Sequence, residues 1–203
     1  VTRGVNRARP LGLGGINDIS SGNGGPPPRK PIPLTQPGER IGEPYLRCDP
    51  DKIVAIVETG HPDRNSAFTP PDEASRLIAS HIIDFLQHEV KRGRLPPELL
   101  PLQSGVGNIA NAVMEGLDDG PFEGLTGYTE VLQDGMLAML RSGKMASASA
   151  TALSLSPAGM ADFLERLDFY RERIVLRPQE ISNHPEVIRR LGLISMNAMI
   201  EAD

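Results

Sequence analysis

The sequence has few of the residues that usually identify a metal site or a disulfide-stabilised fold. It contains no tryptophan and only 4% aromatic residues, so aliphatic and methionine side chains must fill any core. One cysteine, Cys48, excludes an internal disulfide and a cysteine metal cluster. The four histidines show no H-E-x-x-H or other paired-ligand spacing, and we therefore expect no bound metal.

Charge and hydrophobic runs exclude further classes. The net charge of the 203 residues is −5 and no dense basic block occurs, so we expect no nucleic-acid partner. No apolar run approaches the ~18 residues that a membrane span requires, and we expect no membrane association. The first ten residues are basic but lack the apolar core of a signal peptide. We expect a cytoplasmic protein in a bacterium and a mitochondrial one in a eukaryote.

The composition changes near residue 50. Residues 1–50 are rich in Pro, Gly, Arg and Ser, which predicts a linker or an extended connection. Residues 51–203 contain regular apolar patterns and enough hydrophobic residues for a core. The chain lacks an initiator Met and ends in a strand-like run, so we expect 51–203 to be the central α/β segment of a longer protein, truncated at its C-terminal end.

Apolar runs alternate with amphipathic segments along residues 51–203. The runs predict parallel strands that include 53–58, 99–103, 124–129 and 193–199. The amphipathic segments predict helices over 72–92, 108–117, 131–142, 157–167 and 183–192. Such alternation is typical of βαβ units, and we predict an α/β fold with a mostly parallel, Rossmann-like sheet.

A glycine-rich turn follows the second predicted strand. Gly105, Gly107 and Ala110 match the dinucleotide fingerprint G-x-G-x-x-G/A, and an acid, Glu130, follows the next strand. The pattern alone is compatible with a nucleotide cofactor such as NAD or FAD and therefore with an oxidoreductase. It is equally compatible with a tight turn that has no ligand.

Polar residues after other predicted strands have both structural and chemical interpretations. Glu130 could bind a hydroxyl, act as a base or act as a nucleophile, or it could be a solvated acid at a helix start. Arg64 and Arg177 could bind a carboxylate or a phosphate, although loop arginines more often pair with neighbours. Asn183 is placed to cap the helix that follows it.

Five segments in the same order closely resemble the acetyl-CoA hydrolase / succinyl-CoA:acetate CoA-transferase family, a group of class I CoA-transferases. The resemblance extends from about Arg40 to Asp203. The segments are PLQSGVGNIANAV, YTEVLQDGML, ASATALSLSP, LRPQEISNHPEVIRRLG and MNAMIEAD.

The resemblance implies transfer of CoA between acetyl-CoA or succinyl-CoA and acetate or succinate, with slow thioester hydrolysis as a side reaction. It implies an acyl–glutamyl anhydride and a glutamyl–CoA thioester on the enzyme. The partners would be acyl-CoA and small carboxylates, with the CoA thioester as substrate and no permanently bound cofactor. The full-length protein would be a homodimer.

The resemblance also implies roles for individual residues. Glu130 would be the nucleophile, and the backbone N–H of Val106 would stabilise the oxyanion. Asn183 would support the reaction, and Arg64 would face the entrance of the site. The CoA-thioester loop would consist of Gly105, Val106, Gly107, Asn108 and Ile109. Because family members carry a further glycine-rich loop beyond this region, a non-catalytic fragment stays an alternative.

Overall fold

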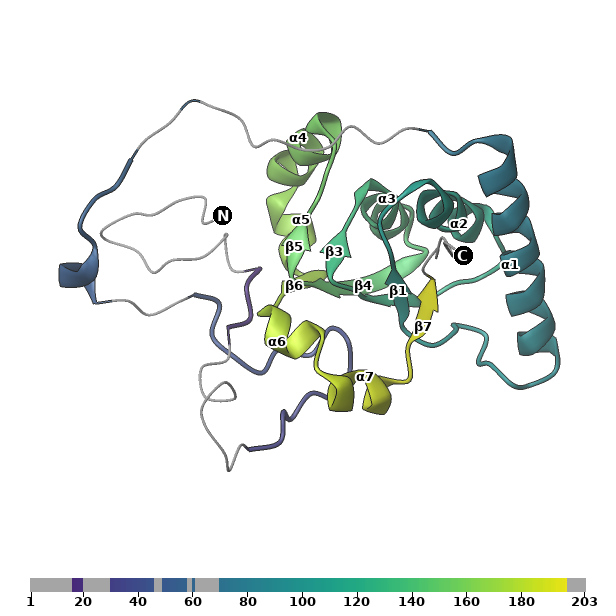
Figure 1. Ribbon diagram of the computed structural model, residues 1–203, viewed down its shortest axis with the longest axis horizontal. Coiled ribbons are helices and arrows are strands. Elements are labelled where there is room, and N and C mark those ends of the chain that lie inside the picture. The colour runs from purple at the N-terminus through teal and green to yellow at the C-terminus, as the bar shows by residue number, and fades with distance from the viewer. Residues whose placement is uncertain (1–15, 20–29, 46–48, 58–59, 61–69, 197–203) are drawn as a thin grey trace, which may run out of the picture.

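A parallel sheet forms the centre of the protein (Figure 1). The computed structural model describes residues 16–19, 30–45, 49–57, 60 and 70–196. The five strands lie in the order β6 (Ile174–Leu176), β4 (Met145–Ala150), β2 (Leu125–Tyr128), β1 (Leu102–Ser104) and β7 (Ile194–Met196). Every pair of neighbours in this sheet is parallel. The predicted α/β class with a mostly parallel sheet is therefore confirmed.

Helices connect the strands, as the sequence predicts. They are α2 (Asn108–Asp119), α3 (Asp134–Ser142), α4 (Pro157–Glu165), α5 (Leu167–Arg171), α6 (Gln179–Ser182) and α7 (Pro185–Leu191). The 3₁₀ helix η1 (Pro50–Lys52) and the long helix α1 (Glu73–Lys91) precede β1. Asp72 caps α1 by accepting a 2.8 Å hydrogen bond from the Ser75 N–H, and Gly93 follows the helix with a φ of 68°. Among the described residues, no helix is long and apolar enough to cross a membrane.

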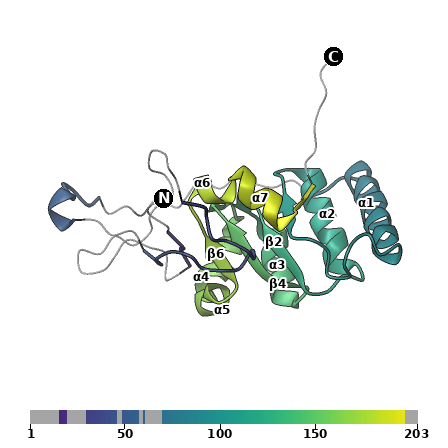
Figure 2. The ribbon, with the colours of Figure 1, turned by 90° about the horizontal axis from the view of Figure 1, so that it is seen from below.

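The two faces of the sheet carry different layers. The main core lies between the sheet and the layer of α2 to α5, with α1 packed against α2, and it contains Leu102, Leu125, Phe163 and Tyr170. A smaller core lies on the opposite face, where α6 and α7 pack over Tyr128 (Figure 2). Its buried members are Ile32, Leu34, Tyr128, Ile181, Val187 and Leu191. The second face is thus closed by two short helices and by an extended N-terminal segment.

The described part of residues 1–50 is extended but closely packed. Ile16 and Leu34 are fully buried, and Asn17 forms a parallel bridge with Leu176 at the β6 edge. The N-terminal segment therefore covers an edge of the sheet whose backbone groups would otherwise be unpaired. The predicted domain boundary between residues 50 and 51 stays a prediction.

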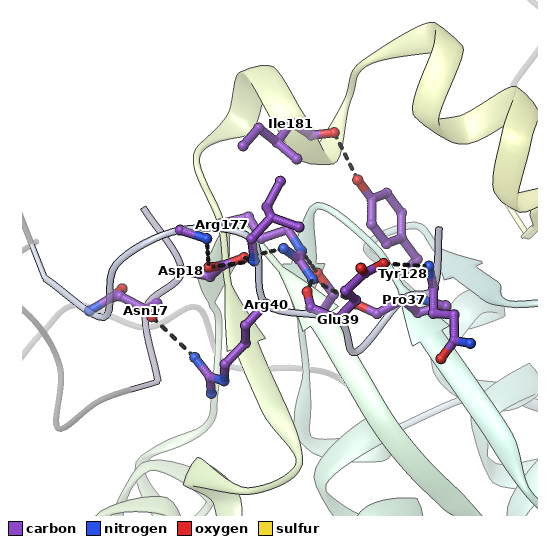
Figure 3. Close-up of polar contacts among 12 residues, drawn as sticks. Asn17, Asp18, Pro37, Glu39, Arg40, Tyr128, Arg177 and Ile181 are labelled. Atoms are coloured by element: carbon purple, nitrogen blue, oxygen red, sulfur yellow. Dashed lines mark hydrogen bonds and ion pairs between the residues drawn. The ribbon is translucent and has the colours of Figure 1, made fainter. Parts of the chain in front are cut away.

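A buried arginine fastens this segment to the sheet (Figure 3). Arg177 follows β6, and its side chain is 0% exposed in an ion pair with the Asp18 carboxylate. Its guanidinium also donates hydrogen bonds to the Ser149 hydroxyl at 2.7 Å and to the carbonyls of Pro37, at 3.0 Å, and Glu39. Burial lowers the pKa of Arg177, and the Asp18 carboxylate opposes this shift. Arg177 is therefore a structural residue that is paired with its neighbours, the interpretation that the sequence favoured over ligand binding.

Two predicted elements differ from the structure. The described residues 53–57 of the predicted strand 53–58 have no regular secondary structure, and Val54 is 97% exposed. β-Branched composition favours a strand but supplies no partner for its backbone, and within the described residues no strand pairs with this run. Residue 58 and residues 197–199 of the last predicted strand lie outside the described residues.

The helix predicted from Val131 begins later. Val131 and Leu132 form β3, which pairs in parallel with β5 (Ala152–Leu153), and α3 starts at Asp134. Leu132 is fully buried, and its carbonyl accepts a hydrogen bond of 2.9 Å from the Ser154 N–H. Pairing with β5 thus overrides the helical pattern for two residues.

We expect Arg177→Met to destabilise the protein by about 3–5 kcal/mol, because it leaves the Asp18 carboxylate buried without its counter-ion. Arg189→Met is the matched control, since Arg189 pairs with Glu186 on the surface and should change the unfolding free energy little. Urea titration followed by circular dichroism measures both variants. Equal, small losses for the two substitutions would contradict the structural role given to Arg177.

Candidate active site

The carboxyl ends of the strands meet at one edge of the sheet, and the strand order reverses there. The chain proceeds from β1 through β2, β4 and β6 in one direction and returns to place β7 on the other side of β1. Ligands in open α/β sheets bind at such a switch point. The glycine turn follows β1 directly, and the Gly105 N–H donates to the Met196 carbonyl of β7 at 3.0 Å.

The glycine turn presents unpaired backbone donors. Gly107 is the N-cap of α2, with a φ of 131° and no side-chain capping hydrogen bond. The first hydrogen bond of the helix runs from the Asn111 N–H to the Gly107 carbonyl at 3.0 Å, so the N–H groups of residues 108–110 precede it. Val106 is 66% exposed, and within the described part of the chain its N–H makes no hydrogen bond. Helix dipole and free donors together favour negative charge here.

Glu130 lies at the junction of two ladders. It follows β2 and precedes β3, and its carbonyl accepts hydrogen bonds from the N–H groups of Thr151 at 2.8 Å and Ala152 at 3.1 Å. The residue is exposed, and the Gln179 amide donates a 3.0 Å hydrogen bond to its Oε1 atom. The backbone of Glu130 is therefore fixed while its carboxylate faces outward.

The two residues before Glu130 connect it to the neighbouring loops. Thr129 is buried, and its hydroxyl donates to the Ser104 carbonyl at 2.9 Å, one residue before the glycine turn. The Tyr128 hydroxyl donates to the Ile181 carbonyl of α6 at 2.7 Å. Burial raises the pKa of Tyr128 to about 12, so the phenol keeps its proton at neutral pH. The predicted convergence of the loops at 104–108, 129–131 and 181–184 is thereby confirmed.

The other predicted site residues have different positions. Asn183 is not a helix N-cap: it ends α6, its backbone N–H donates to the Gln179 carbonyl at 2.8 Å, and His184 precedes α7 instead. Pro185 starts α7 one position later than the pattern predicted, because α6 occupies the residues before it. Arg64 lies outside the described residues.

Two residues that contact this site were not predicted from the sequence as site residues. Gln179 binds the Glu130 carboxylate, and Thr129 ties the glycine turn to the end of β2. Gln179 lies three residues after β6, at the edge of the sheet where ligands bind, and this position could have identified it as a site residue. Thr129 had no signal of its own, since a buried threonine beside a strand is common.

Comparison with known proteins gives close relatives along nearly the whole chain. The chain is 50% identical over 201 residues to an acetyl-CoA hydrolase of Schizosaccharomyces pombe and 47% identical over 199 residues to a succinyl-CoA:acetate CoA-transferase of Clostridium kluyveri. Each alignment covers 98% of this chain, but only 38% and 37% of the relative. An acetyl-CoA hydrolase of Neurospora crassa is 46% identical, again over 98% of the chain. A scan against protein-family models gives no match.

Among solved structures, RipA from Yersinia pestis has a similar fold. It superposes with a TM-score of 0.55 over 73% of this chain and 33% of its own, at 22% sequence identity. This likeness shows the fold alone. The fold is thus shared with a protein of distant sequence.

We expect Gly107→Ala to destabilise the protein by about 1–3 kcal/mol, because a φ of 131° with extended ψ is accessible almost only to glycine. A Cβ at this position meets no atom within 4 Å, so the cost is backbone strain and not a clash. Gly60→Ala is the control, since its Cβ also has open space and its φ lies outside that range. Chemical denaturation compares the two, and equal stability would contradict the conformation given to the turn.

Proposed function

Because this chain is homologous over nearly its whole length to acetyl-CoA hydrolases and succinyl-CoA:acetate CoA-transferases, we propose that it forms the central part of an acyl-CoA:carboxylate CoA-transferase. The substrates are acetyl-CoA or succinyl-CoA with acetate or succinate, and thioester hydrolysis is a side reaction. No permanently bound cofactor is required, and the full-length protein is a homodimer. The chain spans less than two fifths of these relatives, so these statements concern the whole protein.

The proposed reaction begins at Glu130. One carboxylate oxygen attacks the thioester carbonyl carbon, the C–S bond breaks, and CoA leaves as the thiolate to give an acyl–glutamyl anhydride. The thiolate then attacks the glutamyl carbonyl carbon, and the first acid leaves as a carboxylate with one glutamyl oxygen. The resulting glutamyl–CoA thioester reacts with the second carboxylate through the same steps in reverse. Charge balances throughout, and no oxidant or reductant is consumed.

The observation that carries this proposal is an exposed carboxylate on a fixed backbone, at the same edge of the sheet as an uncapped helix N-terminus. The attack of Glu130 places negative charge on the thioester oxygen, and backbone N–H groups stabilise such charge when they are already oriented. Val106 offers a free N–H in the turn, and Thr129 holds that turn against the end of β2. We assign the CoA-thioester loop to Gly105–Ile109 and a supporting role to Asn183 and Arg64.

The second candidate is a nucleotide-cofactor oxidoreductase. The strand, glycine turn and helix of the fingerprint are present as β1, Gly105 to Ala110 and α2, with an acid after the adjacent strand. An acid in this position can also serve as a nucleophile. The relatives are named as a hydrolase and a transferase of CoA thioesters, and these names favour the first proposal.

We expect NAD and NADP not to bind, and we expect CoA or acetyl-CoA to bind to the whole protein. The turn matches the dinucleotide pattern only locally, and the acid is assigned to nucleophilic attack. Isothermal titration calorimetry with each ligand tests this expectation. Micromolar binding of either dinucleotide would restore the oxidoreductase alternative.

We expect Glu130→Ala to abolish transfer and Glu130→Asp to impair it severely, since the shorter side chain withdraws the carboxylate by about one bond length from a site where misplacement by about 1 Å can cost on the order of 100-fold. Incubation of the whole protein with succinyl-CoA, followed by peptide mass analysis without a reducing step, should give a CoA adduct on the Glu130 peptide. The Ala variant should give none.

Glu180→Gln provides the control for this experiment, because it removes another exposed carboxylate near the same edge of the sheet. The adduct and the transfer activity should persist in that variant. Near-normal transfer by Glu130→Ala, or an adduct on another carboxylate, would rule out the proposed nucleophile.

A further inference from the structure

Among the described residues, the Glu130 carboxylate accepts one side-chain hydrogen bond, and its donor is Gln179. Its Nε2 atom donates to Oε1 at 3.0 Å, from the first residue of α6. The two residues come from different loops and lie 49 positions apart in the sequence. An exposed glutamine adds little to stability through one such bond, whereas the same bond acts directly on a carboxylate oxygen.

The hydrogen bond distinguishes the two oxygens of Glu130. Oε1 accepts the Gln179 amide proton, whereas no partner among the described residues binds Oε2. An oxygen that already accepts a hydrogen bond is the weaker nucleophile, because the donor must be released or stretched as its charge falls. Oε2 is therefore the oxygen that attacks, and Oε1 is the oxygen that stays on the glutamyl carbon.

This assignment has a consequence for the second step of the proposed reaction. When the CoA thiolate attacks the glutamyl carbonyl carbon, the retained oxygen becomes the oxyanion of a tetrahedral intermediate. The tetrahedral intermediate then breaks down: the carbonyl at Oε1 re-forms, and the first acid leaves as a carboxylate that carries Oε2. A donor already aimed at the retained oxygen lowers the barrier of this step. The glycine turn performs the same task for the substrate oxygen in the first step, so the two steps use separate donors.

We propose that Gln179 is a positioning residue and oxyanion donor for the Glu130 carbonyl, which favours capture of the anhydride by the CoA thiolate over its hydrolysis by water. The inference rests on the proposed function, because it requires Glu130 to be the nucleophile. Water can attack the anhydride at its acyl carbonyl, a route that does not use the oxygen held by Gln179. Loss of Gln179 therefore slows transfer more than hydrolysis.

The position of Gln179 is secured by the fold. The Tyr128 hydroxyl holds α6 through the Ile181 carbonyl, and Tyr128 lies two residues before Glu130 on β2. Nucleophile and amide donor are thus fixed to the same strand end. The backbone that carries the amide donor is therefore already in place before charge develops on the glutamyl oxygen.

The test uses the whole protein with succinyl-CoA and acetate as substrates, and it measures kcat, KM and the ratio of hydrolysis to transfer. We expect Gln179→Ala to lower kcat for transfer by about 10- to 100-fold, toward the lower range for loss of one oxyanion donor, with little change in KM. The ratio of hydrolysis to transfer should rise. Gln179→Glu should behave in the same way, because it preserves the shape but an ionised carboxylate cannot donate.

Two further variants separate the possible outcomes. Glu180→Gln, on the same helix, should leave kcat and the hydrolysis ratio unchanged. Wild-type kinetics in Gln179→Ala, or a wild-type ratio of hydrolysis to transfer in Gln179→Glu, would overturn the role of Gln179. The proposed function would still stand in that case if Glu130→Ala is inactive and forms no adduct. An active Glu130→Ala would instead overturn both, so the two failures give different results.

Discussion

The end of β2 is held from both sides, and the rest of the site takes its position from this strand. The Thr129 hydroxyl donates to the Ser104 carbonyl of β1, and the Thr129 N–H donates to the Ser149 carbonyl of β4. Tyr128, one residue earlier, holds α6. Glu130 follows directly, so the spacing between its carboxylate, the glycine turn and Gln179 depends on how three consecutive residues pair with their neighbours.

Ser149 of β4 contacts both the arginine that holds the N-terminal segment and the strand that leads to Glu130. Arg177 follows β6 and binds Asp18, while Ser149 accepts a hydrogen bond from the same guanidinium. Ser149 is also the residue whose carbonyl accepts the Thr129 N–H. A buried ion pair adds little stability against an apolar alternative, but it fixes geometry because an unpaired charge in the core is costly. Attachment of the segment is therefore linked, through one serine of β4, to the strand that carries Glu130.

Acyl transfer by a carboxylate, as proposed for Glu130, depends on geometry. A carboxylate in water is a weak nucleophile, and effective acyl transfer needs the thioester held close and its oxyanion stabilised by oriented donors. In the proposed reaction, three local features of the fold would supply these donors: a positive φ at Gly107, an uncapped α2 and a glutamine at the start of α6. The same elements could serve a pyrophosphate, which explains why the glycine pattern alone fits two chemistries.

The sequence by itself determined the features that depend on local patterns: the α/β class, the long helix from Glu73 to Lys91, the glycine turn and the position of Glu130 after a strand. Only the tertiary structure decided features that need a distant partner. Among the described residues, the apolar run at 53–57 has no paired strand, Arg177 is bound by Asp18 from 159 positions away, and Gln179 reaches the Glu130 carboxylate. Periodicity and capping act within a few residues, whereas strand pairing and side-chain partners are set by the packing of the whole chain.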